Sequence, residues 1–196
     1  MIDELFELLP EEIKHHLTRN GHICSFPHNL NNYLEFMGEG ADRTVFALND
    51  DYVVKFETEA NSDQNIQEYY TYQDIEDSRV STKFFTSDEL LDMGVLFAER
   101  VIPMEDYFFN ILGLEFYNVE KRIRIIDYVA DFDLSEHGIH FLTEKLEGYI
   151  DNDILLELVA FADFAMIYGL QDMHSENIGV AKDGRFLALD LGFGSC

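Results

Sequence analysis

The stretches Asp172-Met-His-Ser-Glu-Asn177 and Ala188-Leu-Asp190-Leu-Gly192, close to the end of the sequence, decide the fold of this chain. Asp172, Asn177 and Asp190 stand 5 and 13 residues apart. A hydroxyl that attacks a phosphoryl group needs a carboxylate to orient it and accept its proton, and the phosphates need hard oxygen ligands that carry magnesium. One Asp, one Asn and a second Asp on adjacent turns supply both. Taken alone, these residues are also compatible with an acidic helix end and a hairpin that carry unrelated surface carboxylates.

A glycine-containing segment lies far upstream, at Gly38-Glu-Gly40-Ala-Asp-Arg-Thr-Val45. It matches the phosphate-loop pattern Gly-x-Gly-x-x-Gly-x-Val, except that Arg43 replaces the third glycine. Glycines in such a hairpin allow the backbone to approach phosphate oxygens closely and to donate its N–H groups. A lone Gly-x-Gly is equally compatible with an ordinary tight turn.

The next segment, Tyr52-Val-Val-Lys55-Phe56, places a lysine inside an apolar β-type run. A charged side chain there is costly unless it is paired or bound to a ligand, although a lysine on an edge strand could reach solvent. The order of glycine loop, strand lysine, acid-bearing helix and acidic loop favours a lysine that grips phosphate. Glu68 is the best candidate to pair with it, with Glu76 as the alternative.

Together these motifs resemble the protein-kinase-like superfamily over roughly residues 34–196. The motif Asp-Met-His-Ser-x-Asn is most similar to that of the small serine/threonine kinases of tailed bacteriophages. Position 174 carries His where ordinary protein kinases carry Lys, and Asp-x-His-x-x-Asn is also similar to aminoglycoside and other small-molecule phosphotransferases. The chain departs from the protein-kinase pattern at Leu170, Gln171 and Leu191.

The resemblance implies a chain that uses ATP and magnesium. Asp172 would orient the nucleophile, and His174 would donate to the transferring phosphoryl group or hold the loop. Metal binding would fall to Asn177 and Asp190. The remaining nucleotide-binding positions would be Gly38 and Gly40 over the phosphates, Lys55 with Glu68 gripping them, Val45 and Val53 around the purine, and a hinge from Glu99 to Val101.

The expected fold class is α+β: a two-lobed, protein-kinase-like fold with a truncated C-terminal lobe. We expect an N-terminal helical extension over residues 1–33 and a small lobe over 34–101, with a five-stranded sheet and one helix. A minimal helical lobe over 102–196 would carry the catalytic loop and the Asp-Leu-Gly motif. The chain stops six residues after Asp190, so neither an activation segment nor later helices are expected.

Local patterns place the individual elements. Residues 2–20 indicate a helix or a helical pair, broken near Pro10 and stopped by Gly21. An apolar helix capped by Asp153 should run to Tyr168. The other expected elements are strands at about 34–38, 44–48, 52–57, 83–86 and 94–101, a helix at 64–77, mixed helical structure over 105–150 and a hairpin over 178–189.

The composition predicts a folded, soluble protein. The chain has 196 residues, of which 47% are apolar, with 17 Phe and 10 Tyr, enough for a real core. Its cysteines, Cys24 and Cys196, offer no disulfide framework, which fits a reducing cytoplasm. The acidic N-terminus is unlike a signal peptide. The apolar stretch from Leu158 to Leu170 is interrupted by Asp163 and is too short for a bilayer, so no membrane association is expected.

A net charge of −26 is the second unusual feature. A field of this sign repels nucleic acid and membrane surfaces and attracts basic proteins, so direct nucleic-acid binding is not expected. The charge is compatible with an ordinary solvated surface, or with an acidic decoy that occupies a nucleic-acid-binding groove on another protein. The basic cluster Lys121, Arg122 and Arg124 fits one helix face paired with acids.

The main prediction is an ATP- and magnesium-dependent phage-type protein Ser/Thr kinase. It would act on host proteins, with a basic host protein as a candidate partner, in the host cytoplasm if phage-encoded. The first alternative is a small-molecule, aminoglycoside-type kinase, because an acidic pocket suits a cationic substrate and the peptide-docking platform is missing. The second alternative is a catalytically weak relic that inhibits a basic, nucleic-acid-binding partner.

Overall fold

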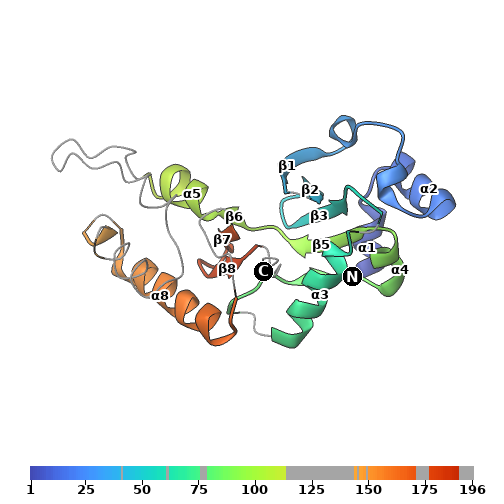
Figure 1. The fold of residues 1–196 in the computed structure, drawn as a ribbon. Helices are drawn as coiled ribbons and strands as arrows, with labels where there is room; N and C mark the ends of the chain where they lie inside the picture. Colours follow the sequence, from blue (N-terminus) through green and yellow to red (C-terminus); the bar gives the residue numbers. More distant parts are fainter. Residues whose placement is uncertain are drawn as a thin grey trace. The chain divides into compact units, whose positions relative to one another are not determined.

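The computed structural model describes residues 1–40, 42–60, 62–75, 79–113, 144, 146–148, 150–170 and 177–189. Its class is α+β, as predicted, and the chain divides into two compact units (Figure 1). Unit 1 comprises Met1–Asp74 and Lys83–Arg100, and unit 2 comprises Ile75–Thr82 and Val101–Cys196. Each unit is described separately below.

Unit 1 is built on a five-stranded antiparallel sheet with the order β1-β2-β3-β5-β4. Helix α3 lies between β3 and β4 along the chain, and the short helix α4 lies between β4 and β5. The five predicted strands and the predicted helix are therefore present. The elements are β1 (Glu35–Glu39), β2 (Arg43–Ala47), β3 (Tyr52–Glu57), α3 (Gln64–Ile75), β4 (Phe84–Phe85), α4 (Asp88–Asp92) and β5 (Val95–Glu99).

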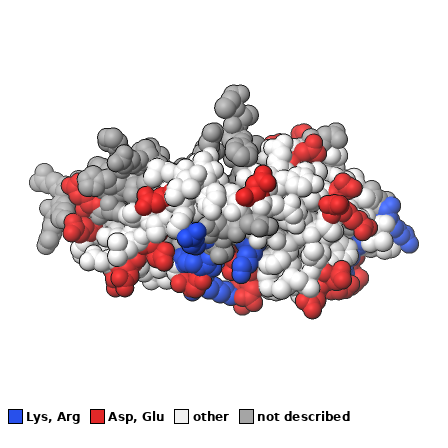
Figure 2. Space-filling view, turned by 90° about the horizontal axis from the view of Figure 1, so that it is seen from below, with Lys and Arg blue, Asp and Glu red and all other residues white. Residues whose placement is uncertain are grey.

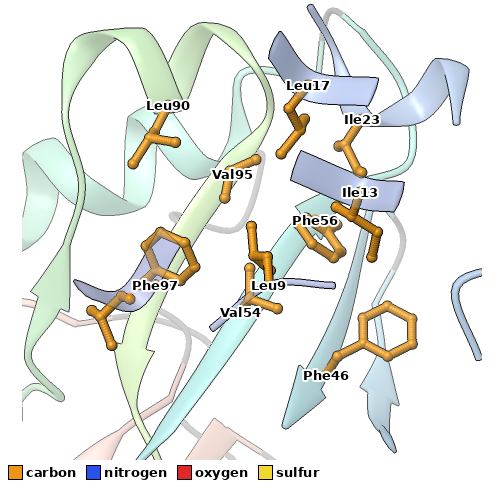
Figure 3. Packing of buried hydrophobic residues seen from close by; sticks show 11 residues of the cluster. Leu9, Ile13, Leu17, Ile23, Phe46, Val54, Phe56, Leu90, Val95 and Phe97 are labelled. Carbon is orange, nitrogen blue, oxygen red and sulfur yellow. The ribbon is translucent and has the colours of Figure 1, made fainter. Parts of the chain in front are cut away.

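One face of this sheet forms the apolar core of unit 1 (Figure 3). Phe46 pairs with Val54 across β2 and β3, and Phe56 pairs with Val95 across β3 and β5. Directly paired residues point to the same side of a sheet, and so do residues two apart on one strand, such as Val54 and Phe56. These apolar side chains therefore lie on one face. Each fully buried side chain of this size contributes about 1.5–3 kcal/mol to folding.

Two N-terminal helices supply the residues that pack against this face. Helix α1 (Ile2–Glu7) and helix α2 (Glu11–Asn20) are separated at Pro10, as the sequence predicts, and Gly21 ends α2 with a φ of 82°. Their buried side chains recur at helical spacing and belong to the same cluster as the sheet residues. Residues near the N-terminus thus form the cover of the sheet. These buried residues are Leu5, Leu9, Ile13 and Leu17.

A glycine fixes the contact between this cover and the sheet. Gly94, just before β5, has a φ of 73°, and a Cβ added to it would lie 2.6 Å from ring atoms of His22. Ile23 follows His22 in a short 3-10 turn (Ile23–Ser25), and its N–H donates to the carbonyl of Met93 at 2.9 Å. Only glycine satisfies both the backbone angle and the close approach.

Unit 2 contains a three-stranded antiparallel sheet with the order β6-β7-β8 and a long apolar helix, α8. The predicted hairpin corresponds to β7 and β8. Of the segment predicted as mixed helical, residues 114–143 and the basic cluster in it lie outside the described residues. Its described beginning is helical. The elements are β6 (Ile102–Pro103), α5 (Met104–Asp106), a π-helical turn (Tyr107–Ile111), α8 (Asn152–Ile167), β7 (Ile178–Val180) and β8 (Phe186–Ala188).

The cap of α8 differs from the predicted one. Asp151, not Asp153, is the N-cap, and its carboxylate accepts the backbone N–H of Asp153 at 2.9 Å. A cap residue must have non-helical backbone angles, and Asp151 has an extended backbone with ψ of 139°, whereas Asp153 already lies in the first turn. Among the described helices, none is both long and apolar enough to cross a membrane.

The surface is dominated by acid. Figure 2 shows acidic side chains spread over the visible face, with fewer basic ones among them. Lys14 pairs with Glu7 and Glu11 at 2.8 and 2.7 Å, and an exposed pair of this kind contributes little to stability. On this face the acidic side chains do not gather into one patch.

Candidate functional site

The buried face of helix α3 is polar. Asn65, Glu68 and Thr71 recur every three residues and are all buried, the first two with no exposed surface. A helix that packs through the hydrophobic effect buries an apolar stripe. Here an amide, a carboxylate and a hydroxyl occupy that stripe, and buried polar groups are tolerated only when they are bonded. Two of the three residues bond to β3, since Glu68 pairs with Lys55 and the Asn65 amide donates to the Lys55 carbonyl, whereas the Thr71 hydroxyl donates to the Gln67 carbonyl within the helix.

Lys55 and Glu68 form the central contact of this face. The Lys55 Nζ lies 2.7 Å from Glu68 Oε1 and 2.9 Å from Glu68 Oε2, and both side chains are buried. The lysine ammonium also lies 5.0 Å from the centroid of the Phe84 ring, a distance at which the ring face attracts a cation. The ion pair that the sequence predicts is thus present. The alternative partner, Glu76, lies outside the described residues.

Besides Glu68 on α3, a second acid, Glu57 at the end of β3, contacts the beginning of α3. Glu57 is buried, and its Oε1 accepts the backbone N–H of Asn65 at 2.8 Å, while its Oε2 lies 3.4 Å from His22 Nε2. A carboxylate at a helix N-terminus satisfies a free N–H group and interacts favourably with the helix dipole. The Asn65 amide also donates to the carbonyl of Lys55 at 3.3 Å. These contacts fix α3 along the lysine strand over its first turn.

Arg43 is the charged member of this cluster that the sequence did not predict. It is buried on β2, and its Nη1 contacts Oε2 of Glu68, the same oxygen that Lys55 approaches at 2.9 Å. The sequence contains a signal for this position, because residues 43, 45 and 47 alternate with the core residues of β2 and so point to the other face. The pairing of Val45 with Lys55 puts that face on the lysine side.

The glycine segment joins β1 to β2 beside this cluster. Gly38 pairs with Val45, and the Gly40 N–H donates to the Arg43 carbonyl at 2.8 Å. A Cβ added at Gly38 or Gly40 would meet no described atom within 4 Å, and neither glycine has a positive φ. Folding of the described residues therefore does not require glycine at either position, in contrast to Gly94.

The predicted purine contacts lie on the same face as the lysine. Val45 is directly paired with Lys55, and Val53 precedes Lys55 by two residues on β3. Val45 is half-buried and Val53 is buried. Their shared face fits the predicted role, but ordinary strand packing gives the same burial, so purine binding remains a prediction.

The predicted hinge has few backbone donors left for a ligand. The N–H of Glu99 donates to the carbonyl of Lys83 at 2.9 Å, and the N–H of Arg100 donates to the carbonyl of Asp51 at 2.8 Å. Both amides are thus engaged within unit 1. Of the three hinge residues, Val101 would have to supply any backbone N–H to a purine.

The other half of the predicted site belongs to unit 2 and is described only in part. Asn177 directly precedes β7, and its carbonyl accepts the N–H of Leu189 at 2.8 Å. Asp172, His174 and Asp190 lie outside the described residues, so their predicted roles remain predictions. Within the described ranges, no group of three or more His, Cys, Asp or Glu side chains could hold a metal ion.

Comparison with known proteins gives no sequence relative. No protein-family model matches the chain, and no curated protein matches it. Three of the solved structures that it resembles are aminoglycoside phosphotransferases. The ADP-bound APH(2'')-Ib is 13% identical, with 93% of this chain and 70% of that chain covered and a TM-score of 0.38.

The other two have similar values. The streptomycin–ATP–APH(2")-IIa ternary complex is 15% identical, with 93% and 70% covered and a TM-score of 0.38. The GDP and kanamycin complex of APH(2")-IIia is 13% identical, with 89% and 72% covered and a TM-score of 0.37. Scores this low leave the functional assignment to the residues of the chain itself.

Proposed function

We propose that this chain is a phosphotransferase that transfers the γ-phosphoryl group of ATP to a hydroxyl with the help of magnesium. The observation that carries the proposal is the buried pair of Lys55 and Glu68, which joins the third strand to the helix after it. In kinase-type phosphotransferases a lysine on the third strand and a glutamate on the following helix must be paired for activity. The chain contains this pair downstream of a glycine loop and upstream of Asp172, Asn177 and Asp190.

Stability alone is a poor reason for such a pair. Replacing a buried ion pair with apolar side chains of similar volume is often neutral or stabilising, because taking charges out of water is costly. The same holds for Gly38 and Gly40, which the packing of the described residues does not require. Phosphate binding accounts for both, since an ammonium neutralises phosphate charge and a glycine hairpin allows close approach of the backbone.

The roles follow from the chemistry of the transfer. The acceptor oxygen forms a bond to the γ-phosphorus, the bond to the bridging oxygen of the leaving ADP breaks, and the acceptor proton passes to the Asp172 carboxylate. Lys55, oriented by Glu68, holds the phosphates. Asn177 and Asp190 provide hard oxygen ligands, the kind that magnesium takes, and the metal when bound neutralises phosphate charge. Catalysis of this type rests on positioning and on charge neutralisation.

As the acceptor we propose a small cationic molecule with a hydroxyl group, the first alternative from the sequence, in place of a protein hydroxyl. Two features support it: the pattern Asp172-x-His174-x-x-Asn177, which is similar to that of small-molecule phosphotransferases, and the net charge of −26, which attracts cations. A protein Ser or Thr hydroxyl is the second candidate, because the wording Asp-Met-His-Ser-x-Asn is most similar to phage protein kinases.

Binding and transfer test the proposal separately. A ligand at 100 times its dissociation constant that binds only the folded state stabilises it by about 2.7 kcal/mol, which is visible as a rise in melting temperature. We expect this rise with ATP and magnesium together and a smaller one with ATP alone. No rise at millimolar ATP and magnesium would rule out the proposed function.

The acceptor class is tested with labelled ATP and two acceptors, kanamycin as a polycationic small molecule and a basic serine-containing peptide. Label on kanamycin alone would identify a small-molecule kinase. Label on the peptide alone would favour the protein-kinase alternative.

A further inference from the structure

Arg43 stands where the phosphate-loop pattern has its third glycine, and its position suggests a function of its own. We propose that Arg43 is a positioning residue: it holds the Glu68 carboxylate from β2, so that Glu68 keeps Lys55 in place without a separate activating movement of α3. This inference rests on the proposed function, because the lysine matters only if phosphate binds there. In the sequence alone, Arg43 is visible only as a replacement of the third glycine of the loop pattern.

Two cations, Lys55 and Arg43, share the Glu68 carboxylate. Lys55 contacts both oxygens of Glu68, and Arg43 contacts Oε2. A carboxylate can accept about four hydrogen bonds, so both cations fit on it. With the guanidinium on one oxygen, the carboxylate cannot rotate freely, and the other oxygen stays turned toward the lysine. Arg43 therefore determines the orientation of the group that orients Lys55.

The two cations come from neighbouring strands. Arg43 is paired with Glu57 across β2 and β3, and Lys55 is paired with Val45, so Arg43 and Lys55 are diagonal neighbours on one face. Movement of α3 away from the sheet would have to break contacts to both strands. In kinase-type enzymes the position of this helix controls activity through the same ion pair. Here the helix is fastened to the glycine-loop strand as well as to the lysine strand.

Arg43 also connects the glycine loop to the cluster. Its backbone carbonyl accepts the N–H of Gly40 at 2.8 Å, and its side chain reaches Glu68. The same residue thus closes the turn that would cover the phosphates and fixes the helix that supports the lysine. A glycine at position 43 could make the first contact but not the second.

The experiment uses the whole chain and three substitutions at one position, Arg43→Met, Arg43→Lys and Arg43→Gly. The matched control is Arg19→Met, at an exposed position on α2. Binding of MgATP is measured by calorimetry, and turnover is measured as label released from ATP per folded molecule, at a temperature where every variant is folded. A merely structural Arg43 would lower the melting temperature but leave the turnover of the folded fraction unchanged.

We expect Arg43→Met and Arg43→Gly to lower kcat about tenfold or more. Arg43, Glu68 and Lys55 belong to one network, and the coupling within such a network is large enough for a change of this size. The affinity for MgATP should change much less, because the substitution disturbs the position of Lys55 in the transfer step and not the binding of the nucleotide. Arg43→Lys should recover part of the rate, and Arg19→Met should match wild type. If wild type binds and turns over ATP but Arg43→Met has wild-type kcat, the inference is wrong and the proposed function stands.

MgATP binding by wild type separates the two failures, and a stability cycle with Arg43→Met, Glu68→Gln and the double variant tests the contact itself. If wild type does not bind MgATP, the proposed function fails, and the positioning role of Arg43 fails with it, whatever the cycle shows. If wild type binds MgATP, non-additive effects in the cycle would support the contact on which the inference rests. Additive effects would overturn it.

Discussion

Replacing Glu68 should destabilise unit 1 more than replacing either of its cations. Glu68 has no exposed surface, and it receives Lys55 on both oxygens and Arg43 on one. Glu68→Gln keeps the shape of the side chain but removes the negative charge that Lys55 and Arg43 both contact. Breaking a buried pair by removing one partner costs about 3–5 kcal/mol, and with two cations affected we expect the upper half of that range. Lys55→Met should cost less, because Arg43 still pairs with Glu68.

Urea denaturation followed by circular dichroism measures this difference. With a slope of about 2 kcal/mol per molar urea, a loss of about 4 kcal/mol lowers the midpoint by about 2 M. The loss is a large fraction of a typical total stability of about 5–15 kcal/mol. Hydrogen exchange in peptides from β3 and α3 assigns the change to unit 1.

The matched control is Glu59→Gln, at an exposed loop position of the same unit. Such a surface substitution should stay within about 0.5 kcal/mol of wild type. A Glu68→Gln midpoint equal to that of Glu59→Gln would refute the buried cluster, and with it the positioning of Lys55 by Glu68.

Three further predictions concern the loop, the hairpin and the charge. Gly38→Ala should leave the melting temperature unchanged but weaken MgATP binding, whereas Gly94→Ala, where an added Cβ lies 2.6 Å from a histidine ring, should lower the melting temperature; an equal loss of stability in both would contradict the distinction. The hydrogen bond from Arg185 lowers the pKa of Asp183, so the carboxylate stabilises the fold above an unfolded pKa of about 3.9. That stabilisation is lost as the pH falls through the folded value. Because the Asp183 side chain is 59% exposed, the free energies of unfolding of wild type and Asp183→Asn, measured with urea, should differ by less than about 1 kcal/mol near pH 7 and converge in strong acid. If the acidic surface works as a decoy, wild type and Asp172→Asn should capture the same basic protein from a cell extract, with capture falling steeply as salt screens charges beyond about 8 Å; we expect no such shared, salt-sensitive partner.

The five strands of unit 1 and its helices α1, α2 and α3 could be predicted because their signals are local, whereas the short helix α4 was not predicted. Alternation marks the strands, Pro10 separates the first two helices, and Gly21 ends the second. The pairing of Lys55 with Glu68 was predictable for a different reason: a lysine in an apolar strand requires a partner, and the next helix offers an acid.

The remaining features depend on contacts between distant segments. The helical pattern of residues 2–20 shows an apolar stripe but not that it covers the sheet opposite α3. The contact of Arg43 with Glu68 was not predicted, because the loop pattern shows only that Arg43 replaces a glycine and not which face of β2 its side chain occupies. The N-cap of α8 was predicted two residues too late. Asp151 and Asp153 are the same residue type, so the sequence does not distinguish them, whereas the backbone angles do.

Transfer of label from γ-labelled ATP, measured with wild type and Asp172→Asn in parallel, shows whether this chain is a phosphotransferase and whether Asp172 takes part. The amide of Asn keeps the shape of the carboxylate but cannot accept the proton of the acceptor. We expect magnesium-dependent transfer or release of label by wild type, and loss of that activity in Asp172→Asn with MgATP binding retained. Equal activity in both proteins would contradict the assignment of Asp172, and absence of activity and of MgATP binding in wild type would contradict the phosphotransferase function itself.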